Sequence, residues 1–260
     1  MFAPLVHLSL TKLSDPTKHR AHNAWRQLDY LPELMLDPGM AWGDAWVQSP
    51  DCAAAASVAP EDASCRFDYA QLYGFRAPEE QSVRRFVDQR ERAFQMGMRP
   101  DVEWAREPFN AFFVPLKGYV NPRVLISADA LPVRPMTGIH LTLSRFLAHD
   151  AAAEAAYRWH DRVCIPDLLE CAGAAGAWTF TSRELFRPTR DLSAPTLRLR
   201  IVYLDGDPLA FTAECNERES RRKADGRHLD ASAVEQPIFA GPLRAIVPWR
   251  WTWFDSHLSH

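Results

Sequence analysis

Apolar and polar residues alternate with the period of a β-strand near the start of the chain and again near its middle, at residues 5–12 and 138–145. Ser14, Asp15 and Pro16 follow the first strand as an N-cap and a first-turn proline, so they predict a helix. The rest of the first half predicts strands near 41–48, 67–75 and 109–117, with a polar helix near 79–96 before the last of them. The second half predicts a helix from an Asp150 cap to about 164, strands near 175–183 and 197–204, a helix near 208–222 and a strand near 243–253. Both halves therefore have the order βαββαβ of a ferredoxin-like unit.

Three matched segments show that the chain contains an internal repeat. The segment from His7 to Leu13 matches HLTLSRF, which begins at His140, 133 positions later. The segments that begin at Trp25 and Trp159 both fit W-x6-P-[DE]-L-x4-G, and PFNAFFVP matches PLRAIVP at nearly the same offset. We therefore predict an α+β fold in which two tandem ferredoxin-like βαββαβ repeats form an intrachain α+β barrel. The expected boundaries are 1–117 for the first repeat, 118–137 for a proline-rich linker and 138–260 for the second repeat.

The W-x6-P-[DE]-L-x4-G segments resemble the EthD-like branch of the dimeric α+β barrel superfamily, over about fifteen residues in each half. This resemblance implies two ferredoxin-like sheets that face each other around a lumen, here within one chain. The chain departs from the pattern where the family has a histidine before Leu-Pro, because Tyr30 and Cys164 stand there. Arg26 and His160 replace the tyrosine that follows tryptophan in the family. A reaction that depends on the family histidine is therefore not implied.

Composition narrows the class of protein. The chain has 47% hydrophobic and 24% charged residues and a net charge of −3, with acids and bases interspersed, so we expect no nucleic-acid partner. Apolar runs stay shorter than the ~18–20 residues that span a bilayer, and the N-terminus is expected to be a strand rather than a signal peptide, so we expect no membrane partner. The five cysteines contain no C-x-x-C pair, which disfavours a disulfide framework or a structural zinc site and favours a cytoplasmic location.

The polar residues of the two first strands are the first candidates for a site. If Val6, Leu8 and Leu10 face the helices, the alternate residues face the lumen. These are His7, Ser9 and Thr11, with His140, Thr142 and Ser144 as their copies. Buried polar groups are costly unless they are hydrogen-bonded, so we interpret the lumen as a wet pocket. The alternative is that these groups only satisfy each other or the backbone.

The second strand adds an acidic candidate. Trp42, Asp44 and Trp46 share one face, and their copies in the other half include Trp178 and Phe180. Desolvation between tryptophans would raise the pKa of Asp44 toward a useful acid/base range, unless that side chain faces solvent instead. Because Asp44 differs from Trp178, as Tyr30 differs from Cys164, we expect the chemistry in the first half.

These residues predict a cofactor-independent enzyme that performs proton transfer, as an isomerase, lyase or dehydratase/cyclase, on a hydrophobic aromatic or polycyclic small molecule. The predicted catalytic residues are His7, Asp44, His140 and Tyr30. The predicted substrate-binding residues are Ser9, Thr11, Trp42, Trp46, Thr142, Ser144, Trp178 and Phe180. Metal, haem and nucleotide motifs are missing from the sequence, so we expect no metal and no cofactor. Two alternative functions stay open: a cofactor-free oxygenase of an electron-rich aromatic, and a non-enzymatic small-molecule-binding or accessory protein. Assembly into a homo-oligomer stays open as well.

Overall fold

The structure is a computed structural model, which describes residues 3–60, 62, 65–147, 149–185 and 196–255. The first repeat contains β1 (Leu5–Leu13), α1 (His19–Trp25), α2 (Leu31–Met35), β2 (Met40–Val47), α3 (Pro50–Ala55), β3 (Ser57–Val58), β4 (Tyr69–Phe75), α4 (Glu79–Gln95) and β5 (Ala105–Val120). The second contains β6 (Gly138–Phe146), α5 (Ala151–Trp159), α6 (Ile165–Leu169), β7 (Ala174–Ser182), β8 (Thr196–Leu204), α7 (Pro208–Ala224) and β9 (Glu235–Ala245). Short 3-10 helices lie at Pro16–Lys18, Pro100–Glu103, Pro122–Val124 and Ala128–Val133.

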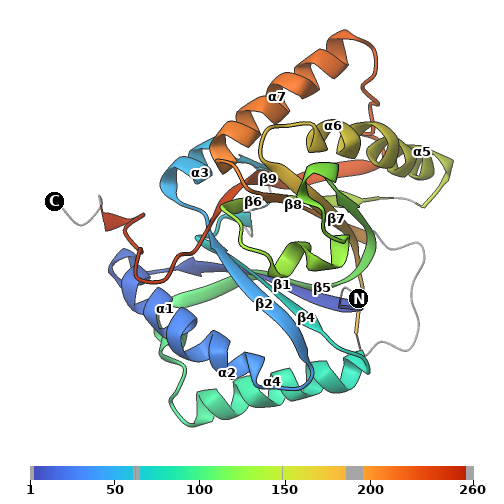
Figure 1. Cartoon of the computed structure of the whole chain (residues 1–260). Coiled ribbons are helices and arrows are strands. Elements are labelled where there is room, and N and C mark those ends of the chain that lie inside the picture. Colours follow the sequence, from blue (N-terminus) through green and yellow to red (C-terminus); the bar gives the residue numbers. More distant parts are fainter. Residues whose placement is uncertain (1–2, 61, 63–64, 148, 186–195, 256–260) are drawn as a thin grey trace.

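The strands form one antiparallel ring. Their order is β2-β4-β1-β5-β7-β8-β6-β9, with β3 attached to β9, and β2 pairs with β9 at Trp46–Ala245 and Val47–Arg244 to close it. Each half has the ferredoxin-like strand order, and the halves join where β5 pairs with β7. Figure 1 shows α1, α2 and α4 outside one side of this ring and α5, α6 and α7 outside the other. The predicted fold of two tandem ferredoxin-like repeats in an α+β barrel is confirmed.

The barrel interior is an apolar core. Alternate residues of β1 and β6 point inward, where they pack with side chains from β2, β4, β5, β7, β8 and β9. The inward residues of these two strands are Val6, Leu8, Leu10, Ile139, Leu141 and Leu143. The prediction that these residues face the helices is therefore wrong, and the polar residues between them lie on the helix side of the sheet. Both faces of each strand are buried, so burial alone did not distinguish the two faces.

Residues from the chain connections complete the barrel core. Leu131, from the 3-10 helix Ala128–Val133 of the linker, is fully buried in this core, as is Cys65 from the segment before β4. The linker lies against β5 and β7 so closely that only glycine fits beneath it: a Cβ at Gly176 would lie 2.6 Å from a methyl carbon of Leu131. Gly118 makes a similar approach to Ala128 possible. The linker is thus packed tightly onto β5 and β7.

The helix starts follow the predicted capping, but the last strand does not follow the predicted alternation. Asp150 caps α5 by accepting a hydrogen bond from the Ala153 N–H at 2.9 Å.

The predicted strand near 243–253 is wrong, because β9 ends at Ala245. Pro248 has no N–H to donate to a ladder, and the segment after it leaves the second repeat. Phe254 stacks on His19 of the first repeat at a ring-centroid distance of 3.6 Å.

Candidate functional site

A cavity of about 320 Å³ lies on the helix side of the second repeat, between the outer face of the sheet and the segment that follows α5. Its apolar lining includes Leu116, Phe146, Ile165, Phe180 and Leu199. Its polar lining consists of Lys117, Thr142, Ser144, Tyr157, His160, Asp161, Thr179, Arg198, Arg200 and Glu235. An apolar pocket with polar groups gathered on its wall is the usual form of a small-molecule site. We call it the second-repeat pocket.

A π-helical turn places the pocket's histidine. In this turn, His160–Cys164, the Ile165 N–H donates to the His160 carbonyl, five residues back. The first repeat has the same turn at Arg26–Tyr30, so the W-x6-P segments of both halves are π-helical. Pro32 and Pro166 follow these turns, and proline has no N–H for a regular helical bond. Isolated π-turns are frequent at functional sites.

His160 belongs to a hydrogen-bonded chain at the pocket wall. Its Nε2 lies 2.8 Å from Glu235 Oε2, and the Ser144 hydroxyl donates to Glu235 Oε1 at 2.7 Å. Burial disfavours the imidazolium, but the hydrogen bonds to Cys164 and Glu235 outweigh burial and raise the pKa of His160 to about 9. Burial also opposes the Glu235 carboxylate, yet the His160 contact lowers its pKa. His160 therefore carries its proton at neutral pH.

Arg200 joins the pocket to Cys164 behind it. Its Nη1 lies 3.5 Å from Cys164 Sγ, and its Nη2 donates to the Thr142 hydroxyl at 3.1 Å. Burial opposes the Cys164 thiolate, but the Arg200 charge and the His160 hydrogen bond lower the pKa of Cys164 to about 7. The buried sulfur and the partly exposed imidazole thus form an acid–base pair.

A second arginine and a tyrosine complete the polar wall. The Arg198 guanidinium lies 4.0 Å from the centroid of the Tyr157 ring, and the buried Tyr157 hydroxyl has no hydrogen-bond partner among the described residues. Lys117 pairs with Asp161 at 3.3 Å on the far side. With His160, Arg198 and Arg200 charged, this wall suits a ligand with an oxygen that carries negative charge.

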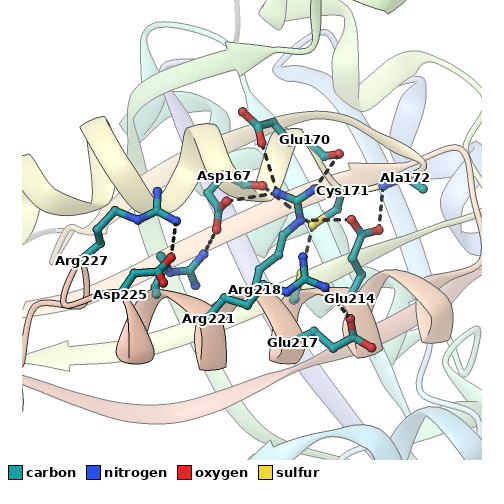
Figure 2. A network of polar contacts seen from close by, with 12 residues as sticks. Asp167, Glu170, Cys171, Ala172, Glu214, Glu217, Arg218, Arg221, Asp225 and Arg227 are labelled. Carbon is teal, nitrogen blue, oxygen red and sulfur yellow. Dashed lines mark hydrogen bonds and ion pairs between the residues drawn. The ribbon is translucent and has the colours of Figure 1, made fainter.

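The helices behind the site are held by an ion network. Asp167, at the start of α6, accepts from Arg218 Nη1 at 3.1 Å and also pairs with the buried Arg222. Arg218 further contacts Glu170 and Glu214 at 3.1 and 3.0 Å, as Figure 2 shows. These contacts fix α6 against α7 directly after the π-turn. The network therefore positions His160 and Cys164.

Some predicted site residues lie in the second-repeat pocket and others do not. Thr142 and Ser144 line it, and Phe180, which is fully buried in the barrel core, borders it as well. His140 is buried on the helix side against Phe211, and burial lowers its pKa to about 3. His7 occupies the matching place in the first repeat, 4.7 Å from Phe112 between ring centroids, where burial lowers its pKa to about 4. Neither histidine faces the lumen, contrary to the predicted orientation, because the inward face of each strand is the apolar one.

The other predicted residues of the first strand lie on the helix side with His7. The buried Ser9 hydroxyl has no hydrogen-bond partner among the described residues, while the Thr11 hydroxyl donates to Gln71 at 3.1 Å. Tyr30 packs on Trp25 at 4.8 Å between ring centroids, in a separate core cluster under α2 and α4. These residues also do not face the lumen, so the polar lining that we predicted for it from the first strands is wrong.

Only the predicted second-strand set faces inward. Trp42, Trp46 and Trp178 pack in the barrel core, and the Trp178 indole donates to the Ala128 carbonyl at 2.8 Å. Burial raises the pKa of Asp44 to about 6, in the direction expected from the sequence. His7 and Asp44 lie on opposite faces of the sheet, so they are not the acid–base partners that we expected.

Asp44 is expected to destabilise the fold at neutral pH. Its pKa is about 6 in the folded protein against 3.8 for the free side chain, so the folded state holds the proton more tightly. Stability from this group is then present at low pH and lost as pH rises through about 6. We predict that Asp44→Asn raises the free energy of unfolding by about 1–3 kcal/mol at pH 7.5, with no gain at pH 3.5. Urea unfolding at both pH values checks this, and a variant that is less stable at pH 7.5 would contradict it.

Sequence reasoning missed His160, Arg198, Arg200, Tyr157 and Glu235 as site residues. One signal was present, because Arg198 and Arg200 alternate with Leu197, Leu199 and Ile201 along the predicted strand. Arg198 and Arg200 would be costly to bury without partners, so their place on one face of this strand indicates that the helices do not fully cover that face. The contact between His160 and Glu235 joins residues that are 75 positions apart.

Comparison with known proteins gives the fold and no closer relationship. No family model matches the chain, and no curated protein matches it. Among solved structures, a putative monooxygenase from Fusobacterium nucleatum has a TM-score of 0.55 at 9% identity, covering 95% of this chain and 94% of that one. An anthrone oxidase-like protein has a TM-score of 0.50 at 12% identity, covering 94% and 91%. A variant of Rhodococcus jostii DypB in complex with heme has a TM-score of 0.51 at 8% identity, covering 94% of each chain. The chain thus shares its fold with these solved structures over nearly its whole length.

The described residues hold neither a membrane-spanning helix nor a cluster of metal ligands. None of the helices among them is long and apolar enough to cross a membrane. Within the same residues, histidine, cysteine, aspartate and glutamate side chains do not gather in a group of three or more that could hold a metal ion.

Proposed function

We propose that this chain is an enzyme that oxidises an electron-rich phenolic aromatic with molecular oxygen in the second-repeat pocket. The observation that carries the proposal is the composition of that pocket, an apolar cavity of about 320 Å³ with His160, Arg198 and Arg200 on one wall. Ligand pockets span ~300–1,000 Å³, so this one suits two or three fused rings.

The charged wall prepares the substrate for oxygen. Cations close to a phenol favour its ionised form and lower its pKa, and the phenolate ring donates electrons far more readily than the phenol. Arg198 and Arg200 are the residues for this role, and the unpartnered Tyr157 hydroxyl can hydrogen-bond the same oxygen. The apolar walls keep water away from the ring and strengthen these interactions.

The reaction balances without an external reductant. A ring CH₂ group conjugated with the phenolate loses one proton to solvent, and the resulting carbanion passes its electrons to O₂. One oxygen atom becomes the new C=O group, and the other leaves as water with the two hydrogens of the CH₂ group. His160 is protonated at neutral pH and donates a proton to the reduced oxygen, and Glu235 holds the ring of His160 in place.

The pocket does not fit a heme, the group bound by one of the structural neighbours. An iron ligand from histidine needs a free ring nitrogen. His160 is the histidine of the pocket lining, and its ring is hydrogen-bonded to both Glu235 and Cys164. The cavity also stands at the lower end of the range for small ligands. No step is therefore assigned to heme.

The names of the structural neighbours support the oxidative proposal over the proton-transfer reaction first expected. A putative monooxygenase and an anthrone oxidase-like protein share the fold at 9% and 12% identity. Membership of the EthD-like branch remains a proposal that rests on the two W-x6-P segments.

An oxygen electrode tests the proposal. We predict that the purified chain accelerates oxygen uptake with anthrone or 1,8-dihydroxyanthrone, with one O₂ consumed for each ketone formed. Turnover of these or related phenols under nitrogen would instead indicate an isomerase, lyase or dehydratase. Binding without turnover under either gas would indicate a non-enzymatic binding protein, and both results would overturn the proposal.

A further inference from the structure

Cys164 differs from the other cysteines in what surrounds its sulfur. His160 hydrogen-bonds to the sulfur from the same π-turn, and Arg200 Nη1 lies 3.5 Å from it. Arg200 also holds the Thr142 hydroxyl at 3.1 Å, so one guanidinium joins a thiol and a hydroxyl. Arg222 adds a further positive charge from α7. By contrast, burial raises the pKa of the Cys52 thiol.

We propose that Cys164 is a peroxide-reactive thiolate, which hydrogen peroxide from the second-repeat pocket oxidises to a sulfenic acid. This activity goes beyond the proposed oxygenation, because it needs no aromatic substrate and no O₂. The thiolate is the nucleophilic form of cysteine, and positively charged neighbours are what stabilise it. The geometry supplies one such neighbour in contact with the sulfur, Arg200 at 3.5 Å, and His160 of the same π-turn adds a second positive charge beside it.

The reaction uses residues that are already in place. The thiolate attacks one oxygen of H₂O₂, an S–O bond forms, and the O–O bond breaks with its electron pair on the departing hydroxide. The sulfur is oxidised by two electrons and the peroxide is reduced by two. His160 gives its proton to the hydroxide, which leaves as water, while Arg200 and Thr142 stand where they can hydrogen-bond the peroxide. An added thiol then condenses with the sulfenic acid to a disulfide and water.

Access to the sulfur selects small peroxides. Cys164 is only 6% exposed, but His160, Arg200 and Thr142 all line the pocket, so the sulfur lies one layer behind its wall. Hydrogen peroxide has two heavy atoms and can pass between these side chains, whereas cumene hydroperoxide is far larger. We expect a strong preference for the smaller oxidant.

The charges around Cys164 set the size of the expected effect. Arg200 contacts the sulfur, His160 and Arg222 add positive charge near it, and Cys215 is a thiol of the same core cluster. Although burial opposes the thiolate, the Arg200 charge and the His160 hydrogen bond lower the pKa of Cys164 to about 7, so a larger share of it is thiolate at pH 7 than of an ordinary thiol. Cys164 should therefore react on the order of tenfold faster than an unactivated cysteine, before any help from Arg200.

The test compares all five cysteines within one protein. The intact chain, free of aromatic substrate, is treated with one equivalent of H₂O₂ at pH 7 in the presence of dimedone, and mass spectrometry follows the labelling of each cysteine. We expect Cys164 to be labelled at least tenfold faster than Cys52, and cumene hydroperoxide to label it at least tenfold more slowly than H₂O₂. Arg200→Met and Thr142→Val should each slow labelling of Cys164, the first by about tenfold. Arg221→Met, which changes an exposed arginine of α7, should leave the rate unchanged.

Equal labelling of Cys164 and Cys52 would overturn the proposal, as would an unchanged rate in a folded Arg200→Met variant. Failure here is distinct from failure of the proposed oxygenation, because the two assays share no substrate. If Arg200→Met does not fold, the Thr142→Val variant decides in its place.

Discussion

Replacing His160 with alanine is expected to lower aromatic-dependent oxygen uptake by about 10²–10⁴-fold, the usual contribution of a positioned acid or base. In the proposed reaction the imidazolium donates a proton to the reduced oxygen, and its contact with Glu235 at 2.8 Å also fixes that carboxylate. The variant removes both functions while it leaves Arg198 and Arg200 to bind the substrate. We therefore expect kcat to fall much more than KM rises. Oxygen-electrode kinetics across a range of substrate concentrations measure both constants.

His228→Ala is the matched control, because His228 is an exposed histidine of the same repeat. It should keep the parental rate. Circular dichroism should show an unchanged fold in both variants. If His160→Ala retains full oxygen uptake while His7→Ala or Asp44→Asn abolishes it, the chemistry belongs to the first repeat.

Trp46→Ala is expected to lower the free energy of unfolding by about 3–5 kcal/mol, the range for a buried tryptophan. The side chain is 1% exposed and packs in the barrel core, near the point where β2 pairs with β9 to close the ring. The residual cavity would lie at the closure, where only two residue pairs join the strands. Urea unfolding, followed by circular dichroism, measures the change.

Trp249→Ala serves as the control for this experiment, since Trp249 is 74% exposed and its loss should change stability by less than about 0.5 kcal/mol. The sequence predicted Trp46 as a wall of the substrate pocket. A stable Trp46→Ala variant with a changed substrate affinity would favour that prediction over a packed core.

The fold could be predicted because the sequence patterns of its strands and helices are local, and because the same order of elements occurs in both halves. The matched segments at His7 and His140, and at Trp25 and Trp159, require two copies of one unit, and strand and helix periods lie within each unit. The last strand was misplaced because the alternation of Trp249, Trp251 and Trp253 suggests a strand, whereas Pro248 and the contacts of the tail with the first repeat decide its path.

The site could be predicted only in part, because strands with two buried faces do not reveal which face is open. Thr142 and Ser144 were identified as candidates, but their direction was inverted. The pocket exists where the helices of the second repeat leave Arg198 and Arg200 uncovered, which depends on how α5 and its π-turn pack on the sheet. The partner of His160 could not be identified from the sequence, since Glu235 lies on β9 at the far end of the repeat.

The most direct test of the central claim is a crystal structure of the chain with 1,8-dihydroxyanthrone bound, prepared without oxygen. The account predicts that the ligand lies in the second-repeat pocket, with a phenolic oxygen within hydrogen-bond distance of Arg200 or Arg198 and the ring CH₂ group next to His160. A ligand inside the barrel, among Trp42, Asp44 and Trp46, would contradict it.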